Sequence, residues 1–173
     1  MTAFYGSANG ITATGASTVH QDSTGVPGAA ESGDAMGAAV SLGDYNLDGY
    51  ADVLVGLPRE DITRASVDQT DAGAALILLG TAGGLASTGS LALNQDTTDI
   101  PGDTEKGDSF GSAVPLTDLR GTIRADLAVG AEGENTGDGT ILQIDTDASG
   151  FIPAGSVYLG SGPLGLVGQA LTP

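Results

Sequence analysis

Short apolar segments recur along the chain and are separated by turns rich in glycine, aspartate and asparagine. Within residues 32–105 four such segments run from about Ala38 to Leu42, Ala51 to Leu57, Ala74 to Leu79 and Ser90 to Asn94. They are short and rich in Val, Ile, Leu and Ala, which is typical of β-strands, and the 29 glycines suit tight turns. The pattern predicts an all-β protein with almost no helix.

The same pattern appears a second time. Residues 32–60 align with residues 106–134 at a constant offset of 74, and Asp52, for example, meets Asp126. The stretch that follows varies in length between the two units and is expected to form loops. The strands expected in the second unit are Ser112 to Leu116, Ala125 to Ala131, Ser156 to Leu159 and Gly165 to Ala170.

Four short strands per repeat, joined by glycine turns, are typical of a β-propeller blade of four antiparallel strands. Phe4 to Tyr5 and Ser17 to His20 correspond to the last two strands of a preceding unit. We therefore expect a single partial β-propeller of about two and a half blades, with a half blade at 1–31 and full blades at 32–105 and 106–173. Propellers close with four or more blades, so open strand edges are expected.

Two short signatures repeat at matching positions in the two units. They read MG at Met36 and GLP at Gly56 in the first unit, then FG at Phe110 and GAE at Gly130 in the second. With the Asp-rich stretch between them, they resemble the FG-GAP repeat of integrin alpha-subunit propellers and their bacterial relatives. The resemblance implies a β-propeller, a calcium loop, an extracellular or cell-surface location and a role in adhesion or ligand recognition.

The stretch 44–52, DYNLDGYAD, carries the candidate chemistry. Calcium takes six to eight hard oxygen ligands, and carboxylate, carboxamide and backbone carbonyl groups often share one site. The spacing resembles the first half of an EF-hand loop, but a strand follows in place of a helix. The predicted calcium ligands are the side chains of Asp44, Asn46, Asp48 and Asp52 and the backbone carbonyl of Tyr50.

An Asp- and Asn-rich turn without an ion is the alternative, because these residues form turns unaided. Three carboxylates within nine residues would repel one another in such a turn, which favours the ion. In the second unit, Arg120 and Thr122 replace the middle ligands between Asp118 and Asp126. There we predict no calcium, and an ion pair of Arg120 in its place.

The charge balance limits the partners. The chain has 22 Asp and Glu against 5 Lys and Arg, a formal net charge of -17, so nucleic acid is not an expected partner. No apolar run is long enough to span a bilayer, so no membrane insertion is expected. A protein or carbohydrate ligand and a homo-oligomer formed through exposed blade edges remain possible partners.

No catalytic constellation is predicted. His20 is the only histidine, nothing around it resembles a nucleophile elbow, and the carboxylates cluster in turns. The favoured function is a non-enzymatic, calcium-binding module for adhesion, ligand recognition or scaffolding in a surface or secreted protein. The alternatives are an accessory propeller portion of a secreted hydrolase, and a self-assembling propeller fragment that completes its blades by oligomerisation.

Overall fold

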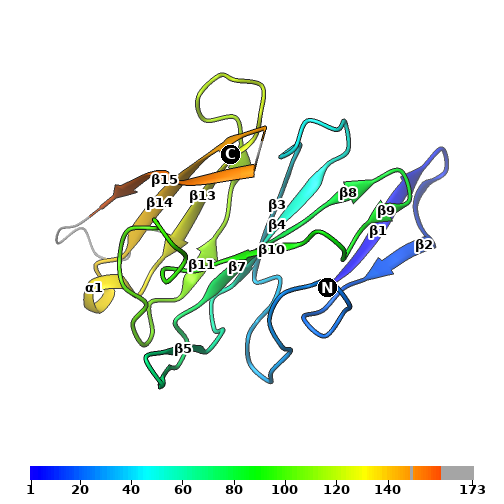
Figure 1. Ribbon diagram of the computed structural model, residues 1–173. Helices are drawn as coiled ribbons and strands as arrows, with labels where there is room; N and C mark the ends of the chain where they lie inside the picture. The colour runs from blue at the N-terminus through cyan, green and yellow to red at the C-terminus, as the bar shows by residue number, and fades with distance from the viewer. Residues whose placement is uncertain (149, 161–173) are drawn as a thin grey trace.

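A computed structural model describes residues 1–148 and 150–160, and β-strands dominate this part of the chain. Three main sheets follow one another in chain order and lie side by side in Figure 1, from the blue N-terminal hairpin to the yellow and orange sheet. The one helical element in the described residues is a single turn, α1 (Glu134–Gly137). The prediction of an all-β protein with almost no helix is confirmed.

The first two sheets are antiparallel and follow the chain order. β1 (Thr2–Ser7) and β2 (Gly10–Thr18) form the N-terminal hairpin. The next sheet has the order β10-β7-β4-β3. Its four strands thus lie in the sheet in the same order as along the chain. Its strands are β3 (Ala39–Gly43), β4 (Asp52–Leu57), β7 (Ala74–Leu78) and β10 (Leu91–Leu93).

Two small hairpins extend the connections of this sheet. β5 (Ile62–Arg64) pairs with β6 (Val67–Gln69) between β4 and β7. β8 (Gly80–Thr81) pairs with β9 (Gly84–Leu85) between β7 and β10. The four strands predicted for the first unit correspond to β3, β4, β7 and β10. Their ends lie within one or two residues of the expected ones.

The third sheet has five strands. Its first edge is divided between two short strands that both pair with β13, and the order continues through β14 to β15. The strands are β11 (Phe110–Ala113), β12 (Leu116–Thr117), β13 (Asp126–Ala131), β14 (Thr140–Asp147) and β15 (Gly150–Leu159).

The prediction for the third strand of this second unit was wrong. The position next to β13 is filled by β14, from a stretch expected to be a loop, whereas Ser156 to Leu159 lie in β15 at the outer position. The side chains of β14 alternate between buried and half-buried from Thr140 to Thr146, which is the period of a strand. Gly165 to Ala170, expected as the fourth strand, lie outside the described residues.

The central strands are buried on both faces because each sheet packs against the next. β4 and β13 read DVLVGL and DLAVGA, nearly continuous apolar runs, and every residue of β13 is buried. Phe110 is 1% exposed and packs in one cluster with Ile77 of the second sheet and Val129 of the third. Met36, at the matching repeat position, packs against the cluster that contains Val19 and Val55. These two side chains therefore pack between successive sheets.

Backbone contacts bring the second and third sheets close together. Phe110 donates its N–H to the carbonyl of Ala72, and Gly111 lies directly against Gly56 of β4. A Cβ atom at Gly56 would collide with the carbonyl oxygen of Gly111. The glycines of the two repeated signatures, one from each unit, therefore meet at the junction between the sheets.

Gly56→Ala is expected to destabilise the protein by about 1–3 kcal/mol, because the added methyl group must push two backbones apart. The measurement is chemical denaturation followed by circular dichroism. Gly6→Ala is the matched control, since nothing lies within 4 Å of a Cβ atom at that position. Equal stability of the two variants would contradict the close approach of the sheets.

Candidate metal centre

The predicted metal-binding stretch forms the connection from β3 to β4. The loop turns back on itself with left-handed backbone at Leu47 (φ 60°) and Gly49 (φ 86°). Glycine adopts this conformation without strain, so Gly49 suits the turn that separates Asp48 from the start of β4. The two ends of the loop are fixed by the antiparallel pair Gly43 and Asp52.

Three of the predicted ligands gather around one turn of this loop. Asp44 accepts hydrogen bonds from the N–H groups of Asp48 (3.2 Å, Oδ1) and Gly49 (3.0 Å, Oδ2). The same Asp48 N–H reaches Asn46 Oδ1 at 2.9 Å. Asp48 accepts from Tyr50 N–H at 2.9 Å and from the Asn46 amide at 3.0 Å. The side chains of Asp44, Asn46 and Asp48 therefore point inward on a shared turn.

Asp52, the fourth predicted side chain, lies deeper. It is 0% exposed, and its two oxygens accept hydrogen bonds from Tyr45 N–H and Gly80 N–H, both at 2.8 Å. Tyr45 belongs to the same loop and Gly80 to β8. The carboxylate therefore ties the loop to the strand that follows β7. Burial raises the pKa of Asp52 above its usual range, with the nearby Asp48 carboxylate acting in the same direction.

Asp52 has no cationic partner among residues 1–148 and 150–160, where its hydrogen-bond donors are the backbone N–H groups of Tyr45 and Gly80. Burying a charged carboxylate is unfavourable unless a cation or several hydrogen-bond donors compensate it. Two N–H donors supply part of this compensation. A positive charge next to Asp52 would supply the rest.

The donor chemistry of the loop fits a hard cation. A carboxylate offers about four acceptor positions, and Asp44, Asp48 and Asp52 each use two of them on the hydrogen bonds above. Oxygen lone pairs therefore remain on each side chain. In the described part of the chain, however, no three His, Cys, Asp or Glu side chains are already gathered as a complete metal cage. A bound ion would have to draw the remaining oxygens together.

The second unit builds the same loop around an arginine. Arg120 occupies the repeat position of Asn46 and forms an ion pair with the fully buried Asp126, with Arg120 Nη2 to Asp126 Oδ1 at 2.7 Å. The guanidinium also donates to the carbonyl of Thr146 at 2.6 Å, and lies 3.4 Å from Asp145. The predicted ion pair of Arg120 is confirmed.

The pKa of Asp126 reflects this cation. Burial raises it, but hydrogen bonds from Arg120 and from Thr146 outweigh burial, so that the pKa lies below the usual range of an aspartate. Thr146 N–H reaches Asp126 Oδ1 at 3.0 Å, as Gly80 N–H reaches Asp52 in the first unit. The two buried carboxylates thus share one matching backbone donor, but Asp52 has a second backbone N–H, from Tyr45, where Asp126 has the Arg120 guanidinium.

A family comparison agrees with this geometry over the first unit. The model of the FG-GAP repeat matches residues 36–78, which include β3, the loop, β4 and β7. Residues 36–78 are an FG-GAP repeat. No curated protein matches the chain. The described residues contain no helix that is both long and apolar enough to cross a membrane.

Some contacts of this FG-GAP repeat had no signal in the sequence. Gly80 and Thr146 donate to the two buried carboxylates through backbone N–H groups, which any residue except proline provides. Arg124, in the second unit, donates to the carbonyl of Tyr45 at 2.9 Å across the junction between sheets. No role for Arg124 was predicted from the sequence, because this contact depends on how the two sheets dock.

Arg120→Met is expected to lower the melting temperature at pH 7 by several degrees, because it leaves the Asp126 carboxylate buried without its cation. Since the folded pKa of Asp126 is depressed, this pair contributes stability above the unfolded pKa of about 3.9 and loses it as the pH falls through the folded value. The deficit should therefore shrink at acidic pH. The measurement is thermal unfolding at several pH values.

The matched control is the double variant Arg120→Met/Asp126→Asn, which removes both charges and should recover part of the lost stability at pH 7. A deficit that is independent of pH and is not relieved in the double variant would show that Arg120 acts by packing alone.

Proposed function

We propose that residues 44–52 bind one calcium ion and that the chain is a calcium-stabilised, non-enzymatic FG-GAP module. The ligands in this proposal are the side chains of Asp44, Asn46, Asp48 and Asp52 and the backbone carbonyl of Tyr50. The module would serve in adhesion, ligand recognition or scaffolding, in a surface or secreted protein. The FG-GAP match over residues 36–78 supports the general role, since repeats of this family form recognition modules.

The observation that carries the calcium proposal is the contrast between the two buried carboxylates. Asp126 is paired with Arg120, whereas Asp52 accepts from two backbone N–H groups and has no cationic partner in the described residues. The position of Arg120 is held by Asn46 in the first unit, and Asn46 offers a neutral oxygen to a cation. One loop carries its own positive charge, and the other carries an oxygen set that suits a calcium ion from solution.

The arrangement of the sheets supports the propeller proposal. β3, β4, β7 and β10 pair in chain order as a propeller blade requires, and the third sheet repeats this order with a divided first strand. In this proposal residues 1–31 form a half blade, 32–105 a blade with the calcium loop and 106–173 a blade with the arginine loop.

Asp48→Ala is expected to lower the melting temperature in calcium and to leave it nearly unchanged in a chelator. Calcium at tenfold excess over its dissociation constant stabilises a folded protein by about 1.4 kcal/mol, which corresponds to about 3–6 °C for a chain of this size. Differential scanning calorimetry in the two media measures the effect. Asp68→Ala, which removes an exposed aspartate of β6, controls for the change in net charge. An equal drop for Asp48→Ala in both media would count against the site.

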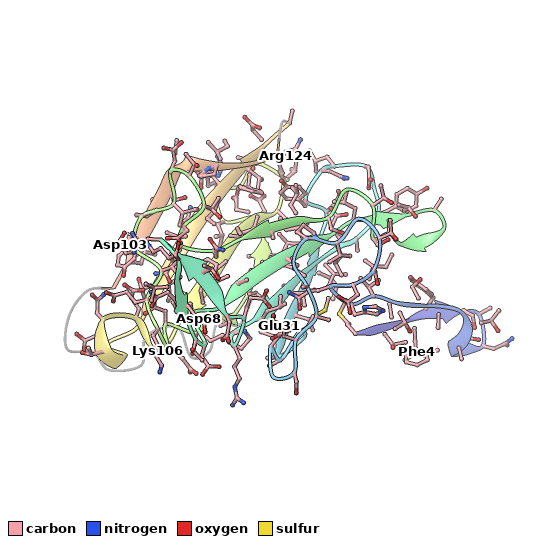
Figure 2. All side chains as sticks on the ribbon, turned by 60° about the horizontal axis from the view of Figure 1, so that its bottom comes forward. Phe4, Glu31, Asp68, Asp103, Lys106 and Arg124 are labelled. Atoms are coloured by element: carbon pink, nitrogen blue, oxygen red, sulfur yellow. The ribbon has the colours of Figure 1, made fainter. Side chains whose placement is uncertain are left out.

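A self-assembling fragment is a second candidate, because β3, at the edge of the second sheet, exposes apolar side chains. Val40 and Leu42 of β3 are 52% and 64% exposed, and Leu42 and Phe4 line an open cavity of about 590 Å³. Phe4 lies on the N-terminal hairpin, at one end of the molecule in Figure 2. Exposed apolar strand edges are sites of association between chains.

If copies associate at this edge, size exclusion with light scattering should give an assembly for the wild-type chain. Leu42→Asp should convert it to a monomer, because a charge cannot be buried in the contact without a partner. A wild-type chain that stays monomeric at high concentration would exclude this second candidate.

A further inference from the structure

The calcium loop of the first unit is held by the second unit. Ala125 N–H donates to the carbonyl of Asp44 at 3.3 Å, and Arg124 Nη1 donates to the carbonyl of Tyr45 at 2.9 Å. Arg124, labelled in Figure 2, lies two residues before β13 of the third sheet. The two contacts thus connect Asp44 and Tyr45, the first two residues of the loop, to the segment that leads into β13 of the third sheet.

The side chain of Tyr45 strengthens this attachment. It is only 4% exposed and packs in the same cluster as Leu127 of β13 and Ile144 of β14. Its hydroxyl oxygen lies under the turn between β14 and β15, where a Cβ atom at Gly150 would come within 2.9 Å of it. The ring of a loop residue is thus part of the core of the third sheet.

Tyr45 stands between two predicted ligands, Asp44 and Asn46, and its own N–H donates to a third, Asp52. Its N–H, its carbonyl and its ring are therefore all fixed, and the second unit fixes the last two. The repeat offers a comparison: Leu119, at the matching position of the arginine loop, is 45% exposed. The burial of the second loop residue is thus specific to the first unit.

We propose that Arg124 is a positioning residue for the calcium site and that the site reaches its full affinity only when the second unit is docked against the loop. This inference rests on the proposed calcium function. Arg124 holds the Tyr45 carbonyl, and through it the direction of the neighbouring ligands Asp44 and Asn46. By reciprocity, calcium in the loop strengthens the docking of the two sheets by the same factor.

Electrostatics alone predicts the opposite effect for the loss of Arg124. Removing a positive charge near a cation site lowers repulsion and should tighten calcium binding. Loss of a positioning hydrogen bond should weaken it, by about three- to tenfold, since only part of the net value of this bond is expected to pass to the neighbouring ligands. The sign of the change therefore separates the two accounts.

The experiment is calcium titration by isothermal titration calorimetry on the folded chain. Arg124→Met should weaken binding three- to tenfold, and Arg124→Lys, which keeps the charge and a donor, should recover part of the loss. Arg59→Met is the matched control, because it removes one exposed arginine with no side-chain contact to the loop, and it should leave the affinity unchanged or slightly tighter. The dissociation constant of the folded protein does not report a general loss of stability.

If Arg124→Met does not fold, Arg124→Gln, which keeps a polar side chain too short to reach the Tyr45 carbonyl, gives the same test. Equal or tighter binding in the Arg124 variants, with normal binding by the wild type, would overturn the inference and leave the calcium site standing. A wild-type chain that binds no calcium would overturn the proposed function itself.

Discussion

The second and third sheets each depend on a buried aspartate: Asp52 at the start of β4 and Asp126 at the start of β13. Asp52 and Asp126 are both 0% exposed, and each accepts a hydrogen bond from a backbone N–H: that of Gly80, just after β7, or that of Thr146, near the end of β14. Each carboxylate thereby fixes how its loop meets the sheet. A carboxylate in this position carries an unfavourable burial free energy that has to be compensated. The composition of each loop can be understood as a way of compensating it.

The two loops answer this constraint differently. In the second unit the cation is a side chain, Arg120, which spans the loop and reaches Asp126, and its presence depresses the pKa of that carboxyl. In the first unit the same position is Asn46, and the pKa of Asp52 is raised by burial. A loop with an internal arginine needs no cation from solution, whereas an oxygen-lined loop can respond to divalent ions. In our proposal, one unit of the pair therefore senses calcium.

Much of this organisation follows from the sequence. The repeat offset, the strands of the first unit and the ion pair of Arg120 with Asp126 were predictable because each depends on local spacing or on residues that the repeat places together. The position of β14 was missed because the stretch after residue 134, which differs in length from its counterpart in the first unit, was expected to form a loop. Strand pairing there is decided by the partner β13, which a local pattern does not identify.

The contacts between units were also beyond the sequence. Arg124 and Tyr45 are 79 residues apart, and the bond between them depends on how two sheets dock. Gly56 and Gly111, which lie against each other at this junction, both belong to the repeated signatures. They are the residues in the sequence that relate most directly to this docking. Side chains that act between repeats become visible only when the sheets are placed next to one another.

The central claim is that the first loop takes an ion and the second does not. A crystal structure determined in millimolar calcium, with anomalous scattering to identify the ion, tests it most directly. The account predicts one calcium ion per chain, bound by residues 44–52, with Arg120 still paired to Asp126. A loop 44–52 without an ion at that concentration, or an ion in the loop of Asp118 to Asp126, would contradict it.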